Sequence, residues 1–133
     1  MEEPTEILVD PDHGIIGDRY AGRSGKRQLT LIQAEHLAVI AEFLHISHVQ
    51  PRLLRRNILV SGVNLLALKK QQVRIGGATI EITGECHPCS YMEEVFGAGG
   101  YNAVRGHGGV TARVLSKGTI GIGAKVMLAE TTN

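Results

Sequence analysis

Cys86-His87-Pro88-Cys89 is the segment of this chain whose side chains are the most reactive, and it contains both of the cysteines. A thiolate is a strong nucleophile and a soft metal ligand, and a nearby His or Arg stabilises its negative charge. Cysteine is also often buried as a small apolar side chain, which is the plain structural alternative. A Cys-x-x-Cys pair that encloses His and Pro is poorly explained by packing alone, so we interpret the segment as a functional thiol site.

Three kinds of thiol chemistry compete for this motif. A structural zinc site needs a complete tetrahedral ligand set, but the chain has no second cysteine pair and only isolated histidines such as His13 and His107. We therefore expect no zinc. A thioredoxin-like redox pair is expected to open a helix early in a βαβ domain, whereas this pair follows a predicted hairpin late in the chain. The sequence favours the third kind, a single catalytic or metal-binding thiolate supported by its neighbours.

Arg55-Arg56-Asn57 leads into the apolar run Ile58-Leu59-Val60 and forms a first candidate anion site. Two guanidinium groups and an amide at the entrance of a strand could clamp a phosphate with bidentate geometry. A cluster of solvated charges on an edge strand is the alternative, and it is common. The residue types permit an anion site here without requiring one.

The glycine-rich segment Arg105-Gly106-His107-Gly108-Gly109 is a second candidate anion site. Closely spaced glycines let backbone N–H groups approach phosphate oxygens, and the flanking arginine adds positive charge. No Gly-Lys-Ser/Thr follows, so the segment is not a P-loop, and taken alone these glycines are better explained as a corner of a barrel. Gly17-Asp18-Arg19 is by itself typical of a polar turn.

The elements that must position these residues form one domain. The chain has 133 residues, of which 43% are apolar, and this is enough for a sizeable core. We predict a single domain over residues 7–128, with flexible ends at 1–6 and 129–133. One long helix is predicted over 34–46, where apolar positions recur at helical spacing. Pro51 can open a further short helical turn.

Short strands make up most of the rest of the chain. Strand candidates lie at 7–9, 28–32, 57–61, 72–75, 78–83, 110–115, 119–122 and 125–128. Gly76-Gly77 predicts a hairpin turn, because glycine tolerates positive φ, and Ser116-Lys117-Gly118 predicts a second hairpin. Parallel βαβ alternation is not seen in the pattern. Many short strands with one principal helix predict a mainly β fold, a small closed or nearly closed β-barrel.

Composition excludes several classes of function. Fourteen Lys and Arg against thirteen Asp and Glu give a net charge of +1, and Trp is absent, so no nucleic acid or membrane partner is expected. No apolar stretch approaches the ~20 residues of a membrane span, and no secretory signal is visible. Two cysteines do not make a disulfide framework, so we expect a cytoplasmic protein with both thiols free.

Taken in chain order, these segments resemble the MOSC domain, which is named for the C-terminal part of molybdenum cofactor sulfurases. The resemblance rests on Gly17-Asp18-Arg19, Arg27-Gln28-Leu29-Thr30-Leu31-Ile32 with Glu35, Arg55-Arg56-Asn57-Ile58, Gly62 with Leu65, Pro88-Cys89, Arg105-Gly106-His107-Gly108-Gly109-Val110-Thr111-Ala112-Arg113-Val114, Gly118 and Gly123. These segments extend over nearly the whole of the predicted domain. No single segment is specific, but their joint occurrence in this order is hard to obtain by chance.

The resemblance implies a strongly bent, mixed β-barrel with a few helices. It also implies a cleft that binds the pterin-phosphate molybdenum cofactor or handles sulfur destined for it. The family's key cysteine matches Cys89, which in relatives ligates molybdenum or carries a persulfide, and Cys86 and His87 would support it. The residues implied to bind the cofactor are Arg56, Asn57, Arg105, Gly106, Gly108, Gly109, Asp18 and Arg19.

The sequence also departs from parts of the family pattern. Reductase members carry a second β-rich domain and a Thr and Asp after the cysteine, whereas Ser90-Tyr91 follows Cys89 here. No pyridoxal-phosphate desulfurase domain is present, so no pyridoxal phosphate is expected. We therefore expect a stand-alone domain that binds molybdenum cofactor, or carries sulfur as a cysteine persulfide for delivery to metal-sulfur centres.

Two alternatives to this function stay open. One is a small molybdenum-dependent reductase of N-hydroxylated compounds that takes electrons from partners. The other is a non-catalytic scaffold that has kept the barrel and lost the chemistry. The expected partners are a sulfur donor such as a cysteine desulfurase, or a molybdoenzyme acceptor. The sequence does not indicate the oligomeric state.

Overall fold

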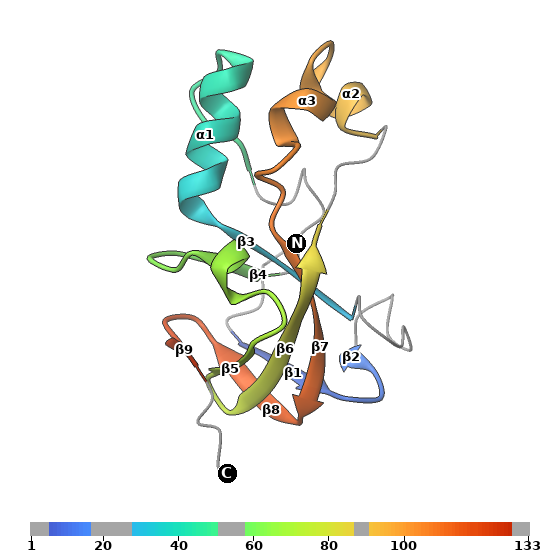
Figure 1. The fold of residues 1–133 in the computed structure, drawn as a ribbon, viewed down its shortest axis with the longest axis vertical. Coiled ribbons are helices and arrows are strands. Elements are labelled where there is room, and N and C mark those ends of the chain that lie inside the picture. Colours follow the sequence, from blue (N-terminus) through green and yellow to red (C-terminus); the bar gives the residue numbers. More distant parts are fainter. Residues whose placement is uncertain (1–5, 17–27, 51–57, 87–90, 129–133) are drawn as a thin grey trace.

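The protein folds as a curled sheet of short strands with a group of helices at one end (Figure 1). The structure is a computed structural model, which describes residues 6–16, 28–50, 58–86 and 91–128. Its elements are β1 (Glu6–Asp10), β2 (Gly14–Ile15), β3 (Leu29–Gln33), α1 (Ala34–Leu44), β4 (Ile58–Val60), the 3-10 helix η3 (Leu65–Leu68), β5 (Gln72–Ile75), β6 (Ala78–Glu85), α2 (Tyr91–Phe96), α3 (Gly100–Val104), β7 (Val110–Ser116), β8 (Gly118–Gly121) and β9 (Val126–Leu128). The prediction of a mainly β, strongly bent fold with one principal helix is confirmed.

The larger sheet is built around the long antiparallel pair β6 and β7. Its strand order is β4-β3-β7-β6-β5-β9. The predicted hairpin of β5 and β6 is confirmed, since Ile75 pairs with Ala78 across the Gly76-Gly77 turn. Gly76 has φ +58°, and a Cβ there would press on the Thr119 carbonyl oxygen, so glycine is required at this turn.

One βαβ unit is present, although the sequence shows no parallel alternation. Strands β3 and β4 are parallel, with Leu31 opposite Ile58, and α1 lies between them in the chain. The unit is not repeated among the described residues, and β4 has only three residues. A single short unit of this kind leaves no alternating pattern for a sequence analysis to detect.

The predicted second hairpin, around Ser116-Lys117-Gly118, is also wrong. Strand β7 pairs with β3 and β6, whereas β8 belongs to a separate sheet of order β2-β1-β8, in which Ile120 lies opposite Ile7. The chain turns away at Gly118, whose Cα packs so closely on the Gly77 backbone that a Cβ would overlap its carbonyl. This close approach sends β8 across to β1 rather than back along β7.

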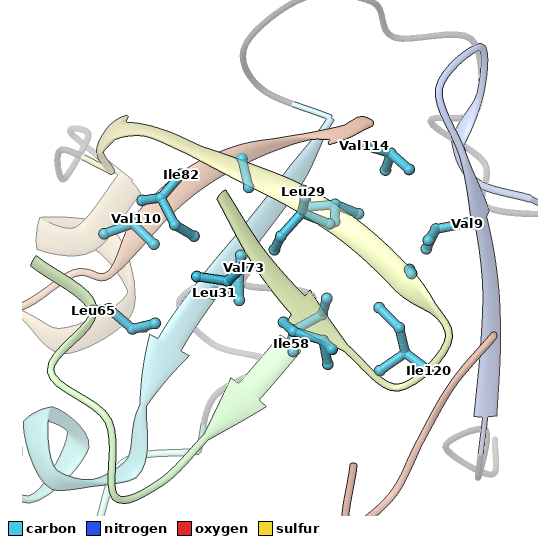
Figure 2. Close-up of a cluster of buried hydrophobic side chains, with 14 residues drawn as sticks. Val9, Leu29, Leu31, Ile58, Leu65, Val73, Ile82, Val110, Val114 and Ile120 are labelled. Carbon is cyan, nitrogen blue, oxygen red and sulfur yellow. The ribbon is translucent and has the colours of Figure 1, made fainter. Parts of the chain in front are cut away.

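Two hydrophobic clusters hold the fold together. The larger one fills the interior of the curled sheet, and Figure 2 shows its side chains pointing into one shared space from strands of both sheets. Its fully buried members, such as Val73 and Ile80, each contribute about 1.5–3 kcal/mol relative to an exposed side chain. The second cluster joins the helices to the sheet and contains Ile32, Leu37, Ile40, Ala41, Val49, Met92, Ala103 and Val104.

Helix α1 is shorter than predicted, because it ends at Leu44 rather than at Ile46. His45 takes a left-handed conformation with φ 59°, and its N–H donates back to the last helical turn. Within the part of the chain that the structure describes, no helix has the length and apolar character needed to cross a membrane.

Candidate functional site

The candidate site lies where three strand ends meet beneath the helices. The start of β7, at Val110, pairs with Leu31 near the end of β3 and with Glu85 at the end of β6. Beyond these pairs, the backbone N–H of Cys86 donates a hydrogen bond of 2.9 Å to the carbonyl oxygen of Gly109. The first cysteine of the thiol motif and the last glycine of the glycine-rich segment are therefore neighbours.

A β-bulge in β6 sets which way the end of this strand faces. The register shifts between Ile82 and Gly84, so that Thr83 is an extra residue opposite β7. The Thr83 and Thr111 hydroxyls lie 2.8 Å apart and hold the bulge in place. Beyond the bulge, the side chains of β6 alternate between the two faces of the sheet in a shifted register. Cys86 is 4% exposed and belongs to neither of the two hydrophobic clusters.

We refer to Arg105–Gly109, the segment between α3 and β7, as the glycine turn. It is fixed in different ways at His107 and at Gly109. The N–H of His107 donates 2.8 Å to the Val104 carbonyl, which continues the end of α3. Gly109 has φ +90°, and a Cβ there would overlap the Leu31 carbonyl oxygen, so only glycine lets the turn approach β3 this closely.

The glycine turn is uncrowded at Gly106. Gly106 has φ +84°, and a Cβ placed on it would meet no atom within 4 Å. The Arg105 side chain beside it is exposed. An exposed guanidinium next to an uncrowded glycine backbone is an arrangement that can receive an anion such as a phosphate.

Helix α3, which leads into the glycine turn, is held at its start by a carboxylate of α2. The Glu93 oxygens accept hydrogen bonds from the N–H of Gly99 at 3.2 Å and the N–H of Tyr101 at 2.8 Å. Both are donors that a helix start leaves unsatisfied. The connection fixes α3 relative to α2 and so fixes the starting position of Arg105.

A second polar connection joins the end of β3 to the loop after β4. Gln33 is 7% exposed, and its side-chain oxygen accepts the Leu65 N–H at 3.1 Å. Glu35 accepts the Gly62 N–H at 2.9 Å, and this hydrogen bond is the main reason that the pKa of Glu35 lies below its ordinary value. These contacts anchor the first turn of α1 on the sheet.

Helix α1 also touches the glycine turn through three rings. The His107 ring centroid lies 5.3 Å from that of His36 in a T-shaped contact and 5.6 Å from that of Phe43. The Nδ1 atom of His107 is buried and has no hydrogen-bond partner among the described residues. Burial lowers the pKa of His36, the nearby His107 lowers it further, and Glu35 opposes the shift.

The structure brings together the predicted site residues that it describes. Cys86 and the glycine turn, with Arg105, Gly106, Gly108 and Gly109, meet at the same end of the sheet. The remaining predicted residues lie outside the described residues and are Cys89, His87, Arg56, Asn57, Asp18 and Arg19. Sequence reasoning gave no role to His36, whose contact with the glycine turn joins distant parts of the chain.

The described residues of the candidate site include a polar surface that suits an anion. Within the described ranges, no group of three or more His, Cys, Asp or Glu side chains could hold a metal. The exposed Arg105 and the open Gly106 backbone instead suit a phosphate group.

Comparison with known families decides the classification. A family model described as the MOSC domain matches residues 14–127. The chain belongs to the MOSC domain family. This family is associated with binding of the molybdenum cofactor. No curated protein matches the chain by sequence.

Solved structures show the same MOSC fold at low sequence identity. The YuaD protein from Bacillus subtilis matches with a TM-score of 0.82 and 19% identity, over 94% of this chain and 85% of that one. YiiM from Geobacillus stearothermophilus matches with a TM-score of 0.76 and 19% identity, over 94% of this chain and 60% of that one. YiiM from Escherichia coli matches with a TM-score of 0.72 and 20% identity, over 99% of this chain and 66% of that one. The chain thus spans less than two thirds of either YiiM protein.

Proposed function

We propose that this MOSC domain binds the molybdenum cofactor at the glycine turn and accepts sulfur on Cys89 as a persulfide. The observation that supports this most directly is the hydrogen bond from the Cys86 N–H to the Gly109 carbonyl, which joins the first residue of the thiol motif to the glycine turn. Cys89 follows Cys86 by three positions in the sequence. The cofactor carries both a phosphate and sulfur. A protein that handles it therefore needs an anion-binding turn and a sulfur nucleophile close together.

The phosphate of the cofactor is the group that the glycine turn would hold. The exposed Arg105 guanidinium can donate charge-assisted hydrogen bonds, and the backbone at Gly106 is uncrowded enough for close approach. Arg56 and Asn57 are proposed as further donors, since the chain continues from them into Ile58, which pairs with Leu31 beside the turn. Asp18 and Arg19 complete the proposed binding set.

The sulfur step needs only a thiolate and a donor persulfide. The Cys89 thiolate attacks the outer sulfur of the donor's persulfide, a new S–S bond forms on Cys89, and the donor S–S bond breaks. The donor cysteine leaves as a thiolate, so the transfer involves no net oxidation or reduction. His87 and the arginines of the site would favour the attacking thiolate by stabilising its charge.

When the cofactor is bound, its molybdenum supplies two-electron redox and oxygen- or sulfur-transfer chemistry, and Cys89 would be the protein ligand to the metal. The glycine turn would orient the pterin by its phosphate. A cysteine desulfurase as sulfur donor, or a molybdoenzyme as acceptor, is the proposed class of partner.

Anaerobic purification followed by intact mass and metal analysis tests this function. We expect a gain of about 32 Da on one thiol, the mass of a persulfide sulfur, after incubation with a cysteine desulfurase and cysteine. Cys89→Ser should abolish the gain, and Cys86→Ser should retain it. Stoichiometric molybdopterin without any persulfide would instead favour the reductase alternative. Absence of both persulfide and molybdopterin would contradict the proposal.

A further inference from the structure

His107 is the ring-bearing residue of the glycine turn, and it packs against one face of helix α1. Its partners His36 and Phe43 are seven positions apart, so they lie on the same side of the helix, two turns from each other. Gly106 and Gly108 flank His107 and have no side chains with which to pack. Ring packing between the glycine turn and α1 therefore runs through the single side chain of His107.

The geometry of this contact favours neutral imidazole rings over charged ones. A charged imidazole carries a proton on both ring nitrogens, and each N–H needs an acceptor when it is buried. The Nδ1 atom of His107 is buried without a partner among the described residues. The His36 ring lies 5.3 Å away, so two charged rings would also repel each other.

We propose that His36 and His107 form a proton-sensitive contact that holds the glycine turn against helix α1 and releases it in acid. This inference rests on the proposed function for its consequence, which is weaker binding of the cofactor phosphate by the glycine turn at low pH. The contact itself is a property of the ligand-free protein. His107 acts here as a positioning residue for Arg105 and Gly106.

The charged and titratable groups on the packed elements are few. Helix α1 carries Glu35 and Glu42 besides His36, α3 carries Tyr101, and the glycine turn carries Arg105 and His107, while β3 has none. Of these, His107 and Glu35 act on His36, in opposite directions. The pKa of His36 is lowered, and a lowered pKa is what a contact that favours the neutral ring should produce.

The direction of the pH effect follows from proton linkage. A histidine whose pKa is lower in the closed contact than in the open state stabilises the closed contact above the open-state pKa. It loses that stabilisation as the pH falls through the folded-state pKa. If the closed contact excludes the proton from His36, opening increases by about tenfold between about pH 7.5 and pH 5.5, given an open-state pKa of ~6.5.

Amide hydrogen exchange of the ligand-free protein tests the contact. We expect exchange of residues 105–110, corrected for the intrinsic pH dependence, to speed up by about tenfold or more over that pH range. His107→Phe and His36→Phe keep a ring in place but cannot be protonated, so each should flatten this response. His48→Gln, at an exposed position outside the contact, should leave it unchanged. A flat response in the wild-type protein, or an unaltered response in both Phe variants, would overturn the proposal.

Two further measurements keep the test decisive. If a Phe variant fails to fold, proton NMR of the wild-type imidazoles still reports the contact, and we expect the pKa of His36 to lie below the ordinary value for histidine. Molybdopterin titrated at about pH 8 and about pH 5.5 tests the consequence: affinity should fall in acid for the wild type and much less for His107→Phe. No molybdopterin binding at pH 8 would refute the proposed function, while the exchange result would still decide the contact.

Discussion

Gly109 packs directly against the backbone of Leu31, so the glycine turn lies in close contact with β3. Gly109 has φ +90°, and any Cβ on it would overlap the Leu31 carbonyl oxygen. Leu31 is fully buried and pairs with Val110, so it has little freedom to move aside. The position of the glycine turn on β3 thus depends on the absence of one side chain.

Gly109→Ala should destabilise the protein more than Gly106→Ala. Both residues have positive φ, which costs an L-residue about 1–2 kcal/mol, but only at Gly109 does the new Cβ meet backbone. Overpacking of this kind adds about 1–3 kcal/mol. Urea unfolding of the two variants measures the difference, and equal losses of stability would contradict the tight contact.

Arg105→Ala and Arg56→Ala should each weaken cofactor binding by about 1.5–3 kcal/mol, the range for a hydrogen bond to a charged group. The Arg105 side chain is exposed, so its removal should leave the melting temperature nearly unchanged. Arg74→Ala, an exposed arginine on β5 at a distance along the sheet from the glycine turn, is the matched control. Titration of molybdopterin monitored by fluorescence compares the affinities of the three variants. An equally large loss of affinity in Arg74→Ala would mean that the arginines attract the cofactor nonspecifically.

Glu35→Gln should flatten the stability profile at acidic pH. The Gly62 N–H donates to the Glu35 carboxylate and lowers its pKa below the unfolded-state value. A lowered carboxyl pKa contributes stability above the unfolded-state pKa, and this stability is lost as pH falls through the folded-state pKa. Melting temperatures of wild type and variant between about pH 6 and pH 3 should converge toward the acid end. Parallel curves would show that the hydrogen bond does not discriminate between the two charge states.

The features of the fold that the sequence predicted are those set by neighbouring residues. The turn at Gly76-Gly77 is fixed by backbone freedom at two adjacent glycines, so the β5–β6 hairpin could be predicted. The pairing of Ile120 with Ile7 joins opposite ends of the chain, and no local pattern specifies it. Helices α2 and α3, of six and five residues, are too short to show a helical period.

The same distinction holds for the candidate site. The glycine turn is one continuous segment, so the sequence showed it directly, but its composition alone favoured a barrel corner and only the family resemblance implied an anion site there. The contact between His36 and His107 depends on how α1 packs over the turn, which no spacing within either segment reveals. One signal was available, because His36 lies on the same helical face as Ile40 and Phe43 and so faces partly inward.

Cys89 should react with iodoacetamide faster than Cys86 near neutral pH, and bound cofactor should block that reaction. Cys86 is 4% exposed, so reagent reaches it only when the protein opens. The proposed role of Cys89 requires a thiolate, so its pKa should fall below the ~8.5 of a free thiol, through His87 and nearby arginines. Labelling across a pH series with peptide mass mapping gives both rates. Cys89→Ser should also leave the melting temperature nearly unchanged, whereas Cys86→Ser, which replaces a buried thiol with a hydroxyl, should lower it. A Cys89 that resists labelling and whose Ser variant unfolds would be a core residue, and sulfur transfer would have to be assigned elsewhere.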